Sequence, residues 1–112
     1  MTPVDFLEAV RKIAATLQPQ QTILFGPRAR GDFGIDSDYD LLIVVDDEIT
    51  ENTLRLAGRA HNAVGHRDFS LDVLVFRRSD FELSLRDQSD AVCYAVADRK
   101  VIYERQKPQM AA

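Results

Sequence analysis

Apolar residues recur along the chain at spacings that predict alternating helices and strands. Over residues 6–17 they fall three or four apart, which predicts an amphipathic helix that Thr2 can cap and that ends near Pro19. Two short apolar runs follow, TILF at 22–25 and DLLIVV at 40–45. Neither run alternates with polar residues, as is typical of strands that are covered on both faces.

The middle of the chain continues this alternation. A second helix is predicted over residues 51–64, with Thr50 as its N-terminal cap and Gly65 as its stop. The stretch FSLDVLVF at 69–76 is rich in residues that favour strands, and it predicts a third strand.

The last third predicts one more helical region and one more strand. Ser79 and Glu82 have the spacing of a capping box and begin the helical region, which the polar residues 87–89 interrupt. A short strand at 101–104 (VIYE) closes the chain. The predicted order is α-β-β-α-β-α-β, which indicates an α/β domain built around a small mixed sheet flanked by helices.

The composition is that of one globular domain. The chain has 112 residues, of which 46% are hydrophobic and 29% are charged. We expect residues 1–105 to form the domain. Residues 106–112 (QKPQMAA) are polar, interrupted by proline and terminal, so we expect them to form a flexible tail.

Charge and cysteine content exclude several classes of function. The formal net charge of −4 argues against a broad basic face, so direct nucleic-acid binding is not expected. Cys93 is the only cysteine, which excludes a disulfide framework and a cysteine-based zinc site and favours a reducing cytoplasm. No apolar run approaches the roughly 20 residues that span a bilayer, so no membrane association is expected.

The loop between the first two predicted strands carries the candidate chemistry. Residues 25–40 read FGPRARGDFGIDSDYD. In an extended chain, residues two apart project to the same side, so Asp38 and Asp40 aim two carboxylates at one point, while Asp36 lies further into the loop. Two ionised carboxylates about 4 Å apart repel by roughly 4 kcal/mol at an effective dielectric constant of about 20, and a bound cation relieves this repulsion.

A third carboxylate lies in the predicted strand at 69–76. Asp72 interrupts its apolar run, where an acid is costly unless it is paired or bound to metal. We therefore predict that Asp38, Asp40 and Asp72 bind Mg²⁺ beside a glycine-containing turn, a site that supports phosphoryl or nucleotidyl transfer. Taken singly, Asp-Ser-Asp is also typical of a solvated turn, and Asp72 of an edge strand that faces water. An EF-hand is excluded, because Leu41 stands where its loop requires glycine.

These residues resemble a known pattern. Gly26-Pro27, ten residues, and then Asp38-Tyr39-Asp40 resemble the Gly-Ser, about ten residues, Asp-x-Asp signature of the polymerase-β-like nucleotidyltransferases. The segment LFGPRARGDFGIDSDYDLLIVV looks most like the minimal nucleotidyltransferase (MNT) proteins, which are small single-domain prokaryotic members. The strand LDVLVF fits the place of their third carboxylate, and AVADRKVIYE resembles their closing helix and strand. The resemblance covers about residues 20–105.

The resemblance implies a polymerase-β-like nucleotidyltransferase fold, a reaction and a partner. Asp38 and Asp40 would bind Mg²⁺, and Asp72 would complete the site and help to deprotonate the attacking hydroxyl. ATP would be the co-substrate. Many MNT proteins are encoded beside a HEPN-domain ribonuclease toxin and act as its antitoxin, and some transfer AMP from ATP to a tyrosine of the toxin.

The chain departs from the family pattern at Pro27. At this position the family has a serine. Its hydroxyl and the backbone N–H groups of the Gly-Ser turn bind the terminal phosphates of the nucleotide, and Gly26 matches the glycine of that turn. Proline has neither N–H nor hydroxyl, although it fits the first turn of a helix. Losing one such donor typically costs about 10²–10³ in rate. Arg28 and Arg30 could compensate through their guanidinium forks, and we expect Arg30 to be the less available, because the family often uses that position to brace the loop.

The leading hypothesis is therefore an Mg²⁺-dependent nucleotidyltransferase that adenylylates a HEPN toxin encoded by the neighbouring gene. The alternative is an MNT antitoxin with weakened or absent catalysis that neutralises its toxin by binding alone. Transfer to a small molecule is a third option, and a homo-oligomer is left open. Of the tyrosines, we expect Tyr39, Tyr94 and Tyr103 to be packed in the interior.

Overall fold

The computed structural model describes residues 4–106, so Thr2 and residues 107–112 of the predicted tail lie outside the described part. The helices and strands, in chain order, are α1 (Val4–Leu17), β1 (Gln21–Phe25), α2 (Pro27–Arg30), β2 (Tyr39–Val45), α3 (Thr53–Val64), β3 (Leu71–Arg77), α4 (Arg78–Arg86), α5 (Ala91–Ala95) and β4 (Lys100–Glu104). This order confirms the predicted one, including the interruption of the last helical region at residues 87–89, and adds the short helix α2.

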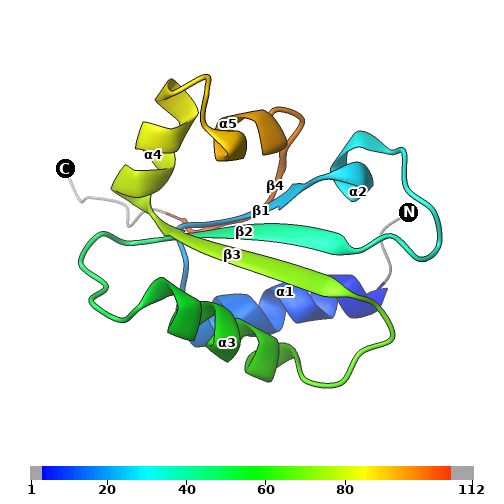
Figure 1. Ribbon diagram of the computed structural model, residues 1–112. Coiled ribbons are helices and arrows are strands. Elements are labelled where there is room, and N and C mark those ends of the chain that lie inside the picture. Colours follow the sequence, from blue (N-terminus) through cyan, green and yellow to red (C-terminus); the bar gives the residue numbers. More distant parts are fainter. Residues whose placement is uncertain (1–3, 107–112) are drawn as a thin grey trace.

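The four strands form one mixed sheet in the order β3-β2-β1-β4. β2 and β3 are parallel, while β1 is antiparallel to both of its neighbours. Helices α1 and α3 cover one face of the sheet, and α4 and α5 lie on the other (Figure 1). The predicted α/β class, with a small mixed sheet flanked by helices, is therefore confirmed.

The central strand β2 divides its side chains between the two layers. Tyr39, Leu41 and Ile43 belong to the core under α1 and α3, and Leu42 and Val44 belong to the core under α4 and α5. Because both sets are buried, the sequence of this strand shows no polar alternation.

Aromatic packing fixes the first residue of β2. The ring of Tyr39 stacks on Phe6 of α1 with 4.0 Å between ring centres, and Phe69 meets it edge-on at 5.3 Å. With Tyr39 turned into this core, strand alternation turns Asp40 to the opposite face of the sheet. The prediction that Tyr39 is packed in the interior is confirmed. Tyr94, by contrast, is 86% exposed, so its predicted burial is wrong.

Two predicted helix caps are replaced by other residues. Asn52, not Thr50, caps α3 and accepts a hydrogen bond from the backbone N–H of Leu54 at 2.7 Å. At the start of α4 the capping box does not form, and Asp47 from the loop after β2 accepts from the N–H of Ser79 at 2.9 Å. Gly65 ends α3 at a positive φ of 69°, as predicted.

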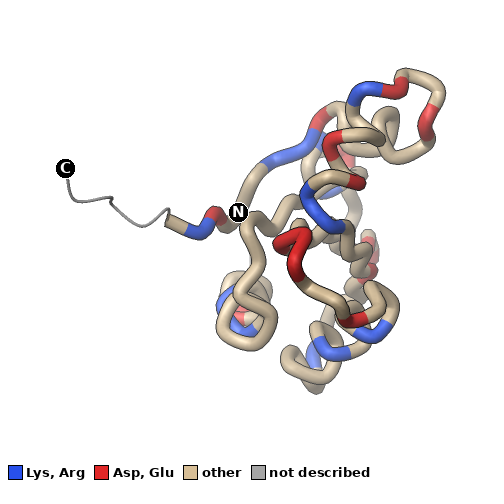
Figure 2. The backbone as a smooth tube through the Cα atoms, turned by 90° about the vertical axis from the view of Figure 1, so that its left-hand side faces the viewer, with Lys and Arg blue, Asp and Glu red and all other residues tan. Residues whose placement is uncertain are grey.

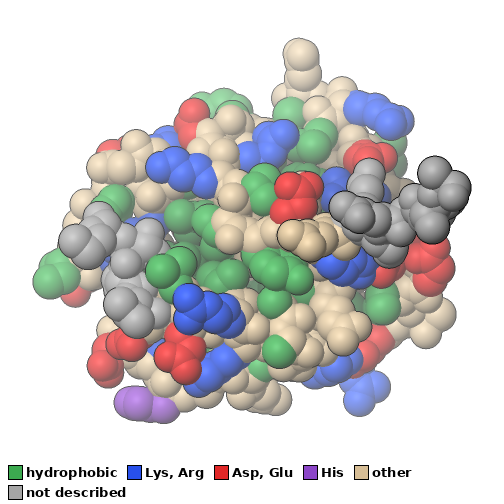
Figure 3. All heavy atoms as spheres, turned by 180° about the vertical axis from the view of Figure 1, so that it is seen from behind, with side chains coloured by type: hydrophobic (Ala, Val, Ile, Leu, Met, Phe, Trp, Pro, Cys, Tyr) green, Lys and Arg blue, Asp and Glu red, His purple; other side chains and the backbone are tan. Residues whose placement is uncertain are grey.

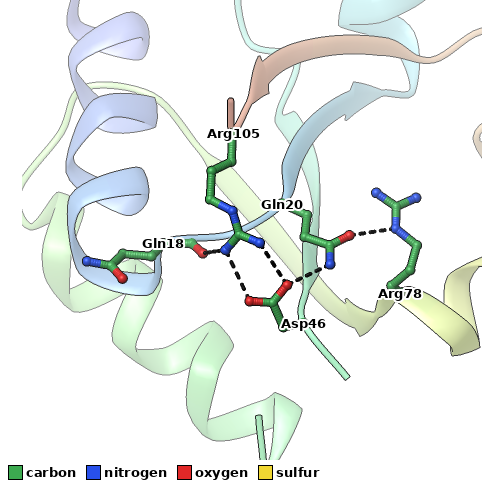
Figure 4. A network of polar contacts seen from close by, with 5 residues as sticks. All are labelled: Gln18, Gln20, Asp46, Arg78 and Arg105. Atoms are coloured by element: carbon green, nitrogen blue, oxygen red, sulfur yellow. Dashed lines mark hydrogen bonds and ion pairs between the residues drawn. The ribbon is translucent and has the colours of Figure 1, made fainter. Parts of the chain in front are cut away.

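A polar network joins the last strand to the end of β2 (Figure 4). The guanidinium of Arg105 donates to both carboxylate oxygens of Asp46, at 2.9 and 3.1 Å, and to the carbonyl of Gln18 at 3.1 Å. Gln20 donates to Asp46 at 2.6 Å and accepts from Arg78 at 2.7 Å. The hydrogen bond from Arg105 is the main reason why the pKa of Asp46 is lowered. The network thus connects the residue after β4 to the residue after β2. It lies at the far end of β2 from Asp40.

Basic and acidic residues are interspersed along the described chain instead of being separated onto two faces (Figure 2). This distribution agrees with the small net charge. Among residues 4–106, no helix is long and apolar enough to cross a membrane.

Candidate functional site

The site begins at the turn after β1, where Gly26 and Asp40 are in contact. Gly26 has φ 75° and ψ −162°, a region that is essentially restricted to glycine. A Cβ at this position would overlap the carboxylate oxygen Oδ2 of Asp40. Glycine is therefore required twice, for the backbone angle and for the space that the carboxylate occupies.

Asp40 meets a second carboxylate across the parallel strands. The register of β2 and β3 sets Asp40 opposite Asp72, on the same face of the sheet. Burial raises the pKa of Asp40, and the charge of Asp72, the charge of Asp38 and a hydrogen bond with Asp72 raise it further. Asp40 is half-buried, while Asp38 and Asp72 are exposed. The structure thus brings two of the three predicted acids into contact and keeps the third near enough to act through its charge.

The carboxylate oxygens of Asp40 and Asp72 are ligands that suit a hard divalent cation. Because the two carboxyl groups lie side by side, each disfavours the ionised form of the other, and a bound cation would relieve this repulsion. The full set of three is not drawn together around one point. In the part of the chain that the structure describes, no group of three His, Cys, Asp or Glu side chains is arranged to hold a metal ion.

Arg28 braces the loop between α2 and β2. Its guanidinium donates to the carbonyl of Ser37 at 2.9 and 3.1 Å and to that of Ile35 at 3.4 Å. It also lies between two aromatic rings, 4.3 Å from the centre of Tyr39 and 4.6 Å from that of Phe33. These contacts give Arg28 the bracing role that we expected of Arg30, so that expectation is wrong.

Arg30 is exposed, whereas Arg28 is half-buried. The positive charge of Arg30 lowers the pKa of Asp40, against the larger effects that raise it. Its side chain makes an exposed ion pair with Asp32 at 3.4 Å, which is weak. Of the two arginines, Arg30 is therefore the one that can turn toward an anion beside Asp40.

Pro27 is the first residue of α2, with Gly26 as its N-terminal cap. The carbonyl of Gly26 accepts from the N–H groups of Ala29 and Arg30 at 3.0 and 3.2 Å. Proline suits this position because its missing N–H would have no partner within the helix. The predicted compatibility of Pro27 with a short helix is confirmed.

Sequence reasoning missed the loop between α3 and β3. An open groove of about 530 Å³ is lined by Asp38 and Asp72 together with His66 and Arg67 of this loop. The guanidinium of Arg67 donates to the carbonyl of Gly65 at 3.0 Å and contacts Nδ1 of His61 at 3.2 Å. No local motif marks this loop. Only its place immediately before the strand that carries Asp72 could have drawn attention to it.

Comparison with known proteins agrees with this fold. A family model described as "Polymerase beta, Nucleotidyltransferase" matches residues 8–108. Among solved structures, a candidate nucleotidyltransferase from Sulfolobus solfataricus aligns over 96% of this chain and 85% of its own, with a TM-score of 0.62 and 20% identity. A toxin–antitoxin structure with AMP-PNP aligns over 89% of this chain and 74% of its own, with a TM-score of 0.55 and 22% identity. No match was found among curated protein sequences.

The contact between Gly26 and Asp40 predicts a measurable coupling. We expect Gly26→Ala to destabilise the fold by more than the about 1–3 kcal/mol of backbone strain alone, because the new methyl group also collides with the carboxylate. In an Asp40→Ala background only the strain should remain, so the two substitutions should be non-additive in urea unfolding.

Gly58 is the matched control for this cycle. It lies within α3, and a Cβ there meets no atom within 4 Å. Gly58→Ala should stabilise the protein by roughly 0.5–1 kcal/mol, whatever residue stands at position 40. Equal costs of Gly26→Ala in both backgrounds would show that the carboxylate does not limit the space at residue 26.

The raised pKa of Asp40 predicts a pH-dependent gain from Asp40→Asn. A carboxyl whose pKa is higher in the folded state than its ordinary 3.8 contributes stability at low pH, and this contribution is lost as the pH rises through the folded pKa. In EDTA, Asp40→Asn should therefore raise the melting temperature by roughly 2–5 °C at neutral pH and by less at about pH 4.5.

Asp36→Asn serves as the control for this prediction, because Asp36 is an exposed loop acid on the same segment. It should leave the melting temperature within about 1 °C at both pH values. A lower melting temperature for Asp40→Asn at neutral pH would mean that the Asp40 carboxylate stabilises the fold, contrary to the prediction.

Proposed function

Since this chain belongs to the polymerase β nucleotidyltransferase family, we propose that it is an Mg²⁺-dependent nucleotidyltransferase that moves AMP from ATP to a hydroxyl group of a partner protein. We propose further that it is the MNT antitoxin of a pair whose toxin is a HEPN ribonuclease. The observation that carries the proposal is the contact between Asp40 and Asp72, set by the parallel register beside the glycine turn at Gly26.

Each side chain of the site has a role in this proposal. Asp40 and Asp72 would hold Mg²⁺, and Asp38, which is exposed on the adjoining loop, would turn toward them. When bound, the cation would offset the negative charge of the triphosphate and of the leaving pyrophosphate. Asp72, on the groove side, would accept the proton of the acceptor hydroxyl. Gly26 and Arg30 would contact the phosphates, while Arg28 would keep the loop in place.

Two observations favour a protein acceptor and a toxin partner. The groove beside Asp38 and Asp72 is open and mostly polar, so it suits a segment of a larger molecule better than a small enclosed substrate. The similar fold seen in a toxin–antitoxin structure with AMP-PNP supports the antitoxin role and the adenine nucleotide. The HEPN identity of the partner rests on the resemblance to MNT sequences.

One observation favours the alternative, in which the antitoxin acts by binding alone. Pro27 leaves the turn with neither the hydroxyl nor the N–H that the family uses for the terminal phosphates. An antitoxin of this kind would keep the fold and the toxin-binding surface while its nucleotide transfer is slow or absent.

Transfer of labelled AMP to the partner protein tests the enzymatic hypothesis. The protein is incubated with ATP labelled on the α-phosphate, with Mg²⁺ and with the purified product of the neighbouring gene. We expect label on that partner, a loss of label of at least about 100-fold in Asp38→Ala/Asp40→Ala, and no loss in the loop control Asp36→Ala. Neutralisation of the toxin without label, unchanged in the double variant, would establish the binding-only alternative.

Pro27 generates a separate prediction about nucleotide affinity. Pro27→Ser restores one hydroxyl and one N–H donor, and we expect it to tighten ATP binding at least about 10-fold in calorimetry with Mg²⁺. Pro27→Ala restores the N–H alone and should give an intermediate affinity. If ATP binds equally to all three proteins, residue 27 does not contact the phosphates.

A further inference from the structure

Ser70 carries a hydroxyl group at the edge of the carboxylate site, and the proposed reaction does not use it. The residue is exposed and directly precedes β3. Its carbonyl accepts a hydrogen bond from the backbone N–H of Tyr39 at 2.9 Å, so the two chains lie side by side where β2 and β3 begin. Because the register pairs Tyr39 with Leu71, the preceding residues of the two chains, Asp38 and Ser70, are neighbours.

Strand alternation sets the Ser70 hydroxyl on the same face of the sheet as the acids. Residues two apart in an extended chain project to one side, so Ser70 lies on the side of Asp72, and Asp38 on the side of Asp40. Asp40 and Asp72 are themselves opposite each other on one face. The four side chains therefore form two neighbouring rows, Asp40 beside Asp72 and Asp38 beside Ser70.

The open groove of about 530 Å³ supports this placement, since Asp38, Ser70 and Asp72 all line it. Of the described residues that line this groove, Ser70 alone has a hydroxyl group. The hydroxyls of Ser37 and Ser89, by contrast, take part in turns: Ser37 accepts from the N–H of Gly34 at 2.9 Å, and Ser89 donates to Asp87 at 2.6 Å. No such bond holds the Ser70 hydroxyl within residues 4–106, so it can turn toward a ligand in the groove.

The order of the strands indicates what this hydroxyl can meet. In the order β3-β2-β1, Asp40 of β2 lies between Ser70 and Asp72 on one side and the Gly26 turn on the other. The attacking and leaving oxygens of an in-line transfer lie on opposite sides of the phosphorus. A nucleotide whose terminal phosphates lie at the Gly26 turn would therefore be attacked from the side of β3, where the Ser70 hydroxyl is.

From these observations we propose that the chain also transfers AMP from ATP to its own Ser70. This inference rests on the proposed nucleotidyltransferase activity and adds a second acceptor to it. The Ser70 oxygen forms a bond to the α-phosphorus, and the bond from that phosphorus to the bridging oxygen of pyrophosphate breaks. Pyrophosphate leaves, and the hydroxyl proton passes to the carboxylate of Asp72. Because acceptor and acids belong to adjoining strand ends of one chain, the transfer is intramolecular.

Labelling of the protein without any partner tests this proposal. The purified chain is incubated with Mg²⁺ and ATP labelled on the α-phosphate, and peptide mass spectrometry locates the modified residue. We expect one adenylyl group on Ser70, loss of the label in Ser70→Ala and retention in Ser70→Thr, which keeps a hydroxyl. Residue 70 is exposed, so circular dichroism should show that both variants fold normally.

Two controls separate proximity from mere exposure. Tyr94→Phe removes a phenol that is 86% exposed, and it should leave the label unchanged. Hydrophobic side chains reach the surface on the β4 side (Figure 3), at the edge of the sheet opposite β3, and Val101 there is 47% exposed. Ser70→Ala/Val101→Ser therefore moves an exposed serine to the other edge, and it should not regain the label.

A mixing experiment tests whether the transfer is intramolecular. Wild-type protein is mixed with a larger, tagged copy that carries Asp38→Ala/Asp40→Ala and keeps Ser70. Only the wild-type chain should be labelled, at a rate that does not depend on protein concentration. Label on the tagged copy would overturn the intramolecular transfer.

Label that persists in Ser70→Ala, or that is found on Tyr94, would overturn the proposal. So would a preparation that labels the partner protein but never itself, and this outcome would leave the proposed function intact. Absence of label from both proteins would instead refute the proposed transfer reaction and this inference together.

Discussion

The parallel register of β2 and β3 is the constraint on which the site depends. It sets Asp40 opposite Asp72, so that two carboxyl groups share one position at the start of two adjacent strands. Such a pair raises the free energy of its own ionised form, and the structure tolerates it because the strands are held from elsewhere. The core under α1 and α3 and the core under α4 and α5 both include side chains of β2, so the register is fixed independently of the acids.

The same strand also connects the core to the loop. The ring of Tyr39 stacks on Phe6, and the guanidinium of Arg28 lies over the same ring in a cation–π contact. Arg28 in turn holds the carbonyls of Ser37 and Ile35. The position of the loop that carries Asp38 is therefore set by an aromatic contact inside the domain. Strand alternation turns Asp40 away from that contact. The aromatic packing that positions the loop and the carboxylate of Asp40 therefore lie on opposite faces of β2.

Most of the fold, and the placement of Asp40 and Asp72 on adjacent strands, could be predicted from the sequence, because both are expressed as local patterns. The spacing of apolar residues predicted the order of helices and strands. Asp72 stood out because it is an acid within an otherwise apolar strand. Features that depend on contacts between distant segments were not accessible. Asp47 caps α4 from a loop about thirty residues earlier. Arg28, not Arg30, braces the loop, because its guanidinium lies over the rings of Phe33 and Tyr39. Tyr94 looked like an interior residue only because its neighbours are apolar.

Pro27 separates what the fold needs from what the proposed reaction needs. For the fold, Gly26 is indispensable, since its backbone angle and the nearby Asp40 carboxylate exclude a side chain, while the next residue has only to begin α2. Proline meets that requirement fully. For phosphate binding the same residue should donate hydrogen bonds, which proline cannot do. If the proposed reaction occurs, a substitution here would therefore change phosphate binding with little consequence for the sheet or the acids. The two proposed functions, an enzymatic antitoxin and an antitoxin that acts by binding alone, thus require the same structure and differ only in how well Arg30 and the remaining backbone N–H groups would bind phosphate at this turn.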